Sequence, residues 1–223
     1  MKSKHFIESQ YQDFFDYEPT QLGYLASYSF QTDPKRISFV SSRYKFVSKM
    51  FSSLTNVLEL GCADGFYAPI VAEAVTNYYG TDFDPIFIDN ANLNNKLLPS
   101  DTFFVHNMIE SSTEKQYDGI FSLDVLEHID KKDEDLFMIN TVRSLKENGI
   151  CIVGMPSLES QKYASEISKK GHVNCKSGPE LKKFLHNFFN NVFIFCMNDE
   201  VVHTGYFPMA SYVIALCCYP NKV

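Results

Sequence analysis

Two glycines four residues apart, directly after a short apolar run, constrain the fold of this chain more than any other feature. The run Val57–Leu60 leads into Gly61-Cys62-Ala63-Asp64-Gly65, and a helical pattern begins at about Phe66. This order predicts a buried strand, a tight turn and a helix N-terminus whose free backbone N–H groups can bind a ligand. The spacing differs from the G-x-G-x-x-G of dinucleotide sites, because Ala63 stands where the middle glycine would be.

An acid within the apolar run narrows the choice of ligand. Glu59 lies two positions before the first glycine, and its negative charge suits a cationic ligand better than a pyrophosphate. The segment Glu59–Gly65 resembles the first motif of the class I S-adenosylmethionine-dependent methyltransferases, and further motifs follow in the family's order between residues 55 and 155. The resemblance implies S-adenosylmethionine as cofactor, bound in part by Glu59, Gly61, Cys62, Ala63 and Gly65.

The rest of the chain alternates apolar strand patterns with helical ones. The seven expected strands lie near residues 57–60, 76–79, 103–105, 119–123, 150–154, 191–197 and 209–217. No helix separates the last two of them. The pattern predicts a Rossmann-like α/β fold: a seven-stranded, mostly parallel sheet with one antiparallel strand at its end and helices on both faces. One helix is expected to start near Asp133 and to end at Gly149 as its C-cap.

The 223 residues are enough for one such domain with a sizeable core. We divide it into an N-terminal helical cap (1–54), a cofactor-binding core (55–155) and an acceptor-side region (156–223). Arg36 and Arg43 of the cap are interpreted as solvated, with contact to a substrate anion as the alternative. The cap also carries aromatic residues that either cover the site as a lid or pack as a terminal arm: Phe6, Tyr11, Phe14, Phe15, Tyr17, Tyr24, Tyr28 and Phe30.

In the family, further cofactor contacts follow the later strands, and matching positions occur here. Asp82, after the second strand, matches the acid that accepts hydrogen bonds from both ribose hydroxyls, and Phe83 is placed to cover the adenine. Asn107 stands where an acid often accepts from the adenine amino group, and its amide oxygen can do the same. The predicted cofactor site also includes three neighbours, Met108, Leu123 and Asp124.

The segment Asp124-Val125-Leu126-Glu127-His128 is the most informative stretch on the acceptor side. In a helical turn, positions i, i+3 and i+4 share a face, so two carboxylates and an imidazole would converge. The segment resembles the Glu-x-x-Glu-His set of the ubiquinone-pathway O-methyltransferases, with Asp124 in place of the first acid. Three interpretations stay open. Asp124, Glu127 and His128 bind a divalent metal, or His128 acts as a base without metal, or the three residues have a purely structural role. The metal is not the favoured one.

A polar excursion over residues 156–177 follows the fifth strand and lies beside the reacting methyl group in this architecture. Residues on such loops are disproportionately used for binding and catalysis. His172 therefore joins Asp124, Glu127 and His128 as a catalytic candidate. Three further polar residues are weaker candidates for contact with the acceptor: Asn174, Lys176 and His203.

Bulk composition narrows the partners. The formal net charge of −7 argues against nucleic acid or an anionic membrane as the main partner, because both need a basic surface. No apolar run approaches the ~20 residues that a membrane span needs, and the N-terminus lacks the apolar core of a signal peptide. The six cysteines form no C-x-x-C pair, and we interpret them as reduced residues of a cytoplasmic protein. The sequence leaves the oligomeric state open.

These observations favour transfer of a methyl group from S-adenosylmethionine to a small-molecule acceptor, at a hydroxyl of a metabolite or glycan building block. Methyl transfer from a sulfonium mainly requires an acceptor held in line with the methyl group, so few acceptor-side residues are specified in advance. N-methylation of a small amine is the alternative reaction. A non-catalytic, cofactor-binding scaffold is the alternative class, and the intact Glu59, Gly61, Gly65 and Asp82 weigh against it. The glycine spacing disfavours a nucleotide-dependent oxidoreductase.

Overall fold

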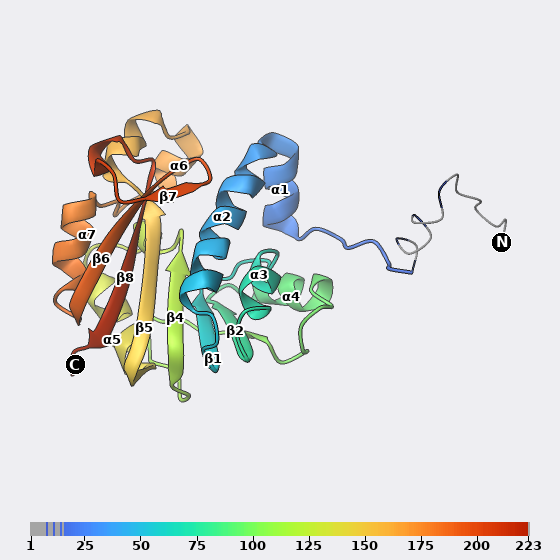
Figure 1. Cartoon of the computed structure of the whole chain (residues 1–223), viewed down its shortest axis with the longest axis horizontal. Helices are drawn as coiled ribbons and strands as arrows, with labels where there is room; N and C mark the ends of the chain where they lie inside the picture. Colours follow the sequence, from blue (N-terminus) through green and yellow to red (C-terminus); the bar gives the residue numbers. More distant parts are fainter. Residues whose placement is uncertain (1–7, 9–10, 12–13, 15, 223) are drawn as a thin grey trace.

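One sheet organises the fold of the computed structural model, which describes residues 8, 11, 14 and 16–222. Its strands are β1 (Asn56–Leu60), β2 (Asn77–Asp82), β3 (Phe103–Val105), β4 (Tyr117–Leu123), β5 (Leu145–Pro156), β6 (Phe189–Asn198), β7 (Val201–His203) and β8 (Tyr212–Pro220). Their order across the eight-stranded sheet is β3-β2-β1-β4-β5-β8-β6-β7 (Figure 1). Phe6 and Phe15 of the predicted aromatic cap lie outside the described residues.

The strand directions confirm the predicted Rossmann-like class with a mostly parallel sheet. Strands β3, β2, β1, β4 and β5 run parallel, whereas β8 is antiparallel to both of its neighbours, β5 and β6. The structure differs from the prediction in two details. The antiparallel β8 lies between β5 and β6 rather than at the end of the sheet, and Val201–His203 add an eighth strand, β7, which is antiparallel to β6. A tight turn joins β6 to β7, and its residue Asp199 has a left-handed φ of 48°, which Asp adopts more readily than most residues.

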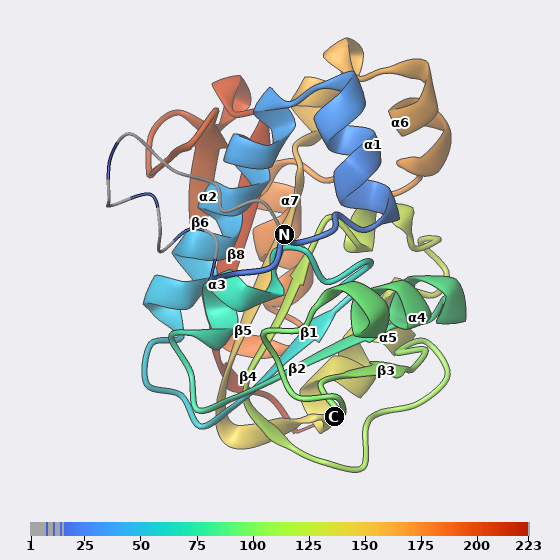
Figure 2. The same ribbon diagram turned by 90° about the vertical axis from the view of Figure 1, so that its right-hand side faces the viewer.

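Helices cover both faces of the sheet, as Figure 1 and Figure 2 show from two sides. The α-helices are α1 (Tyr24–Thr32), α2 (Lys35–Met50), α3 (Ala68–Ala72), α4 (Pro85–Asn94), α5 (Glu134–Arg143), α6 (Glu166–Gly171) and α7 (Gly178–Leu185). Short 3₁₀ helices occupy Leu126–His128 (η3), Leu158–Tyr163 (η4) and Phe207–Met209 (η5). Successive strand residues point to opposite faces, so in β4 Ile120 joins the apolar layer of α5 and α7 and Phe121 joins that of α2 and α3.

The helix predicted from Asp133 is shorter than expected. It ends at Arg143, and Gly149 lies inside β5 rather than at a helix C-cap. The cause is that Leu145 is buried against the sheet and pairs with Tyr117 of β4, so the chain has already left the helix. The pairing register then shifts, because the next pair joins Gly119 of β4 to Ile150. Residues 146–149 form the irregular stretch between these two pairs.

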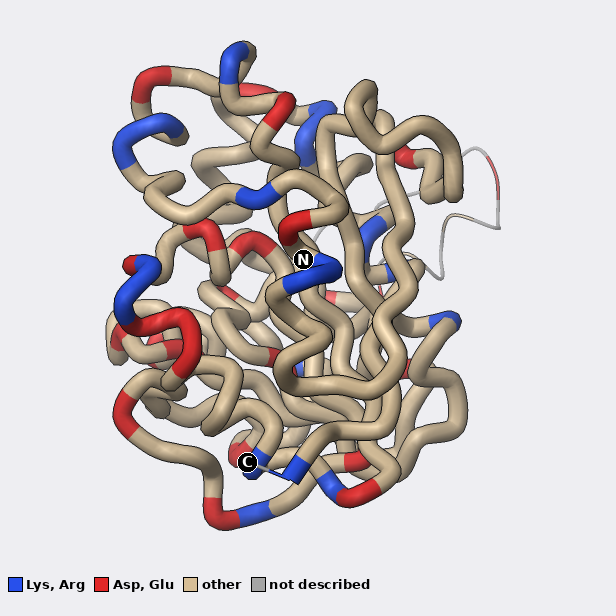
Figure 3. Tube along the Cα trace, turned by 90° about the vertical axis from the view of Figure 1, so that its left-hand side faces the viewer, with Lys and Arg blue, Asp and Glu red and all other residues tan. Residues whose placement is uncertain are grey.

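The surface carries both signs of charge. On the side drawn in Figure 3, Lys and Arg positions are scattered among Asp and Glu positions along the described chain. No helix within the described residues has the length and apolar character required to cross a membrane. All six cysteines are free thiols, as predicted, and four of them are buried: Cys62, Cys151, Cys196 and Cys217.

Candidate active site

A cavity of about 740 Å³ opens at the carboxyl ends of β1, β2 and β4, the edge at which open α/β sheets bind ligands. The glycine turn, the segments after β2, β3 and β4, and residues of α1 and α2 form its wall. The predicted site residues that line it are Gly61, Cys62, Ala63, Asp82, Phe83, Asn107, Met108, Leu123, Asp124 and His128. Four other predicted site residues lie outside its lining, namely Glu59, Gly65, Glu127 and His172.

The turn after β1 is fixed by backbone hydrogen bonds and by two glycines. The N–H groups of Gly61 and Cys62 both donate to the carbonyl oxygen of Thr81, at 2.7 and 3.0 Å. Gly61 has a φ of +75°, and a Cβ there would lie 2.3 Å from Cγ2 of Val125. Gly65 has a φ of +67° and packs against an aromatic ring of β3. Gly61 therefore brings bare backbone to the cavity wall, whereas Gly65 allows the turn to pack behind it.

Asp82 ties the glycine turn to the end of β2. Its Oδ2 accepts a hydrogen bond from the N–H of Ala63 at 3.1 Å, and its Oδ1 accepts from the N–H of Asp84 at 3.0 Å. Burial raises the pKa of Asp82, and the backbone N–H donors oppose this rise. Each carboxylate oxygen has a second lone pair, so both oxygens can still accept from a diol in the cavity.

Glu59 lies behind the cavity wall. It is buried, and its carboxylate accepts hydrogen bonds from the hydroxyls of Tyr44 and Tyr78. Burial raises the pKa of Glu59 to about 7, although the two hydroxyl donors act to lower it. Of these three side chains only that of Tyr44 lines the cavity, so Glu59 supports the cavity wall through its two tyrosine partners.

The remaining predicted cofactor residues form the rim and the apolar part of the wall. Phe83 is 71% exposed at the cavity, and Met108 and Leu123 are buried in its wall. Asn107 donates from Nδ2 to Oε1 of Glu110 at 2.9 Å, and its Oδ1 accepts from the backbone two residues further on at 3.1 Å. These bonds fix the orientation of the amide and leave one lone pair of Oδ1 for a ligand.

Asp124 is paired with Arg43 of α2. The guanidinium Nη1 lies 2.6 Å from Oδ2 of Asp124, and the Arg43 Cζ lies 3.7 Å from the ring centroid of Tyr212. Asp124 has a left-handed φ of 58°, and its N–H donates to the carbonyl oxygen of Gly154 at 3.0 Å. The interpretation of Arg43 as a solvated residue is wrong, because its side chain is 14% exposed and holds this acid.

Glu127 follows on η3 with its side chain turned into the protein. It is 0% exposed, and neither carboxylate oxygen has a hydrogen-bond partner among the described residues. Burial, followed by the charge of nearby Asp124, raises the pKa of Glu127 well above its ordinary value. Its backbone carbonyl accepts from the N–H groups of Val173 and Asn174, at 2.8 and 3.0 Å. Glu127 therefore joins η3 to the acceptor-side loop through its backbone.

Two histidines meet at the acceptor end of the site. The ring centroids of His128 and His172 are 5.1 Å apart. His128 Nδ1 lies 2.9 Å from the carbonyl oxygen of Gly171, and His172 Nδ1 lies 2.8 Å from Oε1 of Gln161. Both acceptors are oxygens, so each Nδ1 donates and each Nε2 of the neutral ring carries a lone pair. Burial, followed by the proximity of His128, lowers the pKa of His172.

The side chains that are spaced to hold a metal differ from the predicted set. Asp124 is committed to Arg43, whereas ligand atoms of Glu127, His128 and His172 lie within 4.8 Å of one another. One carboxylate and two imidazoles suit Zn²⁺ or Mn²⁺ better than Mg²⁺. A metal-bound form of this site would therefore use His172 in place of Asp124.

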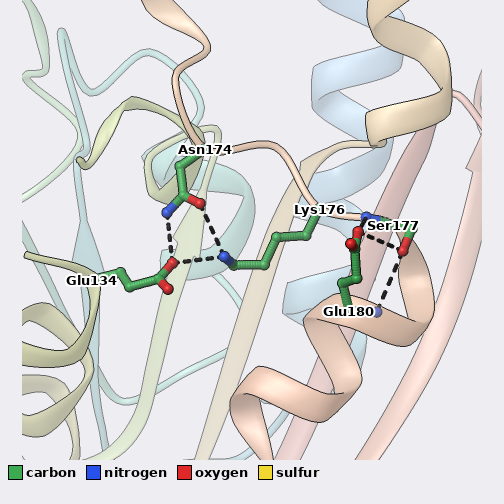
Figure 4. A network of polar contacts seen from close by, with 5 residues as sticks. All are labelled: Glu134, Asn174, Lys176, Ser177 and Glu180. Atoms are coloured by element: carbon green, nitrogen blue, oxygen red, sulfur yellow. Dashed lines mark hydrogen bonds and ion pairs between the residues drawn. The ribbon is translucent and has the colours of Figure 1, made fainter. Parts of the chain in front are cut away.

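The weaker acceptor candidates lie outside the cavity lining. Asn174 and Lys176 are buried in a network with Glu134 of α5 (Figure 4). Lys176 Nζ lies 2.6 Å from Oε2 of Glu134 and donates to Oδ1 of Asn174 at 3.0 Å. Asn174 Nδ2 donates to the same Glu134 oxygen at 2.7 Å. His203 lies on β7 with its ring bonded within its own hairpin. The network therefore anchors the acceptor-side loop.

Several residues that shape the site were not in the predicted site set, and α2 supplies most of them. Arg36, Val40 and Tyr44 line the cavity, and Arg43 holds Asp124; the two arginines were considered only as alternative contacts for a substrate anion. Their spacing of four, three and one residues places them on one side of a helix, which is the signal that could have identified them as a set. Tyr212 on β8 has no comparable local signal, because it reaches the site only through the sheet order.

The parallel sheet, the glycine turn after β1 and the acid at the end of β2 together define the class I methyltransferases. The sequence model of the family described as "Methyltransferase domain" matches residues 32–191, so the chain belongs to this family. The expected class is thereby confirmed, and S-adenosylmethionine is the cofactor of that class.

Curated relatives share part of the sequence. The ubiquinone biosynthesis O-methyltransferase of Rickettsia canadensis (strain McKiel) is 28% identical over 118 residues, which cover 52% of this chain and 47% of that protein. The protein of the same name from Rickettsia bellii (strain OSU 85-389) is 27% identical over 139 residues, covering 59% of this chain and 54% of that protein. The chain thus spans about half the length of the curated relatives it matches.

Solved structures share the fold. The N-methyltransferase NodS from Bradyrhizobium japonicum WM9, in complex with S-adenosyl-L-homocysteine, superposes with a TM-score of 0.68 at 18% identity, covering 96% of this chain and 100% of that one. An S-adenosylmethionine-dependent methyltransferase from Clostridium acetobutylicum ATCC 824 gives a TM-score of 0.67 at 11% identity, covering 88% of this chain and 98% of that one. At these identities the likeness establishes the fold.

Proposed function

We propose that this chain transfers the methyl group of S-adenosylmethionine to a hydroxyl of a small-molecule acceptor. The observation that carries the proposal is that one cavity is lined both by the glycine turn with Asp82 and by Asp124 with His128. A donor bound to the first group would share the cavity with an acceptor at the second, and methyl transfer mainly requires such positioning.

On the cofactor side, the ribose is proposed to bind Asp82, with the adenine between Phe83 and Asn107. Support comes from the fixed Asp82 carboxylate, whose two backbone donors leave lone pairs facing the cavity. The exposed Phe83 ring offers an apolar face at the rim, and Asn107 offers an oriented amide oxygen. These three side chains match the chemistry of a nucleoside.

On the acceptor side, His128 is proposed as the general base. Its Nδ1 donates to Gly171, so Nε2 is the nitrogen with the free lone pair. As the acceptor oxygen attacks the methyl carbon, the new C–O bond forms while the C–S bond breaks and its electron pair returns to sulfur. The hydroxyl proton moves to Nε2 of His128, and neutral S-adenosylhomocysteine leaves.

N-methylation of a small amine is the alternative reaction. A neutral amine attacks without prior loss of a proton, so it has less need of a base at His128. The curated relatives named as O-methyltransferases favour the hydroxyl. The net charge of −7 favours a small molecule over nucleic acid, and the six free thiols favour a reducing, cytoplasmic location.

Calorimetric titration with S-adenosylhomocysteine, repeated with NADH, tests the proposal. We expect micromolar binding of S-adenosylhomocysteine and no binding of NADH. Gly61→Ala is the matched variant, because its Cβ would meet Val125 at the cavity wall and displace the turn. Failure of the well-folded chain to bind S-adenosylhomocysteine would refute the enzyme proposal.

A further inference from the structure

Helix α1 forms one wall of the cavity but packs only through its inner side. Leu25, Ala26 and Ser29 line the cavity, and Ala26 and Ser29 are buried there. The outer side of α1 exposes large aromatic side chains, among them Tyr24 and Tyr28. In Figure 1 and Figure 2, α1 lies next to α2 and above α3 and α4. Something other than extensive apolar packing must therefore hold α1 in place.

The first turn of α1 is capped by side chains from other parts of the chain. Gly23 is the N-cap residue and offers no side chain of its own. The N–H of Tyr24 donates to Oδ1 of Asn90 at 2.9 Å, and the N–H of Ala26 donates to Oδ2 of Asp64 at 2.8 Å. Free N–H groups of a first turn are normally satisfied by a local Ser, Thr, Asp or Asn. Here the acceptors belong to α4 and to the glycine turn.

Gly23 is fitted to this contact by its size. A Cβ at Gly23 would lie 2.4 Å from Cβ and Oδ2 of Asp64, so the Gly23 backbone can lie this close to the Asp64 side chain only if the residue is glycine. Its φ of −70° is ordinary for any residue, so the requirement is one of space. The close approach places the start of α1 directly against the turn that forms the cofactor wall.

We propose that Asp64 and Asn90 are positioning residues that latch α1 over the bound cofactor. The inference rests on the proposed function. A ligand in the cavity contacts α1 and the glycine turn together, so it stabilises the latched arrangement over the open one. Release of the cofactor then requires α1 to leave, and its departure breaks both hydrogen bonds.

The decisive variant is Asn90→Ala, because Asn90 holds α1 and does not line the cavity. Loss of one hydrogen bond should speed dissociation of S-adenosylhomocysteine about fivefold, measured by chase of labelled ligand. Hydrogen–deuterium exchange at the amides of α1 should rise in parallel. Asn92→Ala, on the same helix but bonded to the carbonyl of Phe103, is the matched control and should leave both readouts unchanged.

Asp64 and Gly23 provide independent tests. Asp64→Asn keeps an oxygen that can accept from the N–H of Ala26, so hydrogen–deuterium exchange at the α1 amides should stay as slow as in the unaltered chain. In Asp64→Ala this exchange should be faster. Gly23→Ala should displace α1 without removing any polar group and should match Asn90→Ala in its dissociation rate. This variant also covers the case in which Asn90→Ala fails to fold.

The outcomes separate the latch from the proposed function. If the unaltered chain does not bind S-adenosylhomocysteine, the proposed function fails, and the latch fails with it as a cofactor device. If the ligand binds but its dissociation rate is the same in the unaltered chain, Asn90→Ala and Gly23→Ala, the latch alone is overturned. Faster exchange of α1 without faster dissociation would also overturn it, because α1 would then open independently of the cofactor.

Discussion

The guanidinium of Arg43 lies 2.6 Å from the carboxylate of Asp124, and this contact joins the N-terminal helices to the end of the central strand β4. The ring of Tyr212 lies beneath the same guanidinium. Asp124 is held in the left-handed region by this pair and by its backbone bond to Gly154. Asp124 is therefore oriented by a helix that precedes the whole sheet in sequence.

Replacement of Arg43 by methionine should destabilise the protein and weaken cofactor binding. Removing one partner of a largely buried ion pair leaves the other charge unpaired, at a cost of about 3 kcal/mol. Urea unfolding measures this loss, and calorimetry with S-adenosylhomocysteine measures the second effect. Lys146→Met is the control, because the Lys146–Asp118 pair is more exposed and should lose less than ~1 kcal/mol. Equal losses in both variants would show that Asp124 does not depend on Arg43.

Asp82→Ala should weaken S-adenosylhomocysteine binding by ~1–3 kcal/mol, the typical value of hydrogen bonds to a charged group. Asp84→Ala is the matched control. Asp84 accepts from the N–H of Ile86 as the N-cap of α4. Its loss should lower stability by about 1 kcal/mol and leave affinity close to that of the unaltered chain. An unchanged affinity in Asp82→Ala would remove Asp82 from the cofactor site.

Glu59 gives the protein a pH-dependent stability. Burial raises its pKa from 4.5 in the unfolded chain to about 7 in the folded one, so the folded state holds this proton more tightly. The associated stability is fully present below pH 4.5 and is lost as the pH rises to about 7. The expected change is about 3 kcal/mol over this window. Urea unfolding should show that Glu59→Gln loses less free energy of unfolding between pH 4.5 and 7 than the unaltered chain does.

The quantity to compare is the free energy of unfolding of Glu59→Gln minus that of the unaltered chain, at each pH. This difference should become more favourable to the variant as the pH rises. Glu147→Gln, at an exposed position of β5, controls for removal of a carboxylate elsewhere. A difference that stays constant from pH 4.5 to 7 would contradict the raised pKa of Glu59.

His128→Ala should slow methyl transfer by 10²–10⁴-fold, the usual contribution of a general base, while S-adenosylhomocysteine affinity stays unchanged. His172→Ala should have a smaller effect, because His172 lies outside the cavity lining. The measurement is turnover of a hydroxyl acceptor found by screening, with and without a metal chelator. Loss of activity with the chelator, together with equal losses in both variants, would contradict the metal-free base and support a metal at Glu127, His128 and His172.

Lys176→Met should cost about 3–5 kcal/mol of stability, because it leaves the buried Glu134 carboxylate without its cation. The double variant Glu134→Leu with Lys176→Met should recover much of this loss. Lys169→Met is the control, since Lys169 pairs with Glu166 on the surface and should lose less than ~0.5 kcal/mol. Thermal or urea unfolding compares the three variants. A loss in Lys176→Met no larger than in Lys169→Met would contradict the anchoring role of the network.

The glycine turn, Asp82 and the alternation of strands and helices are predictable from sequence because local patterns determine them. Gly61 and Gly65 mark positive φ values, and Asp82 is the last residue of β2. The short β7 and the early end of α5 are not predictable in this way. Both depend on pairing with a neighbouring strand, which overrides the helical pattern at Leu145 and the loop composition around Val201.

The acceptor side is less predictable because its side chains are oriented by distant partners. Asp124 depends on Arg43, and Glu59 depends on Tyr44, both from a helix that periodicity alone assigns to packing. Glu127 fits the helical spacing of its motif, but its side chain turns inward and His172 takes the neighbouring place. Such relationships require the three-dimensional order of α2, β4 and the acceptor-side loop.

The excursion after β5 is closed at its base. Ser157 and Lys176 form an isolated parallel bridge, the N–H of Leu158 donates to the carbonyl oxygen of Lys176 at 3.1 Å, and Ser157 Oγ donates to Ala210 at 2.6 Å. The excursion therefore leaves and rejoins the sheet at one point. Residues 158–172 can change in length or sequence with little effect on the pairing of β5 with β8, whereas Asn174 and Lys176 keep the returning end of the loop fixed to Glu134.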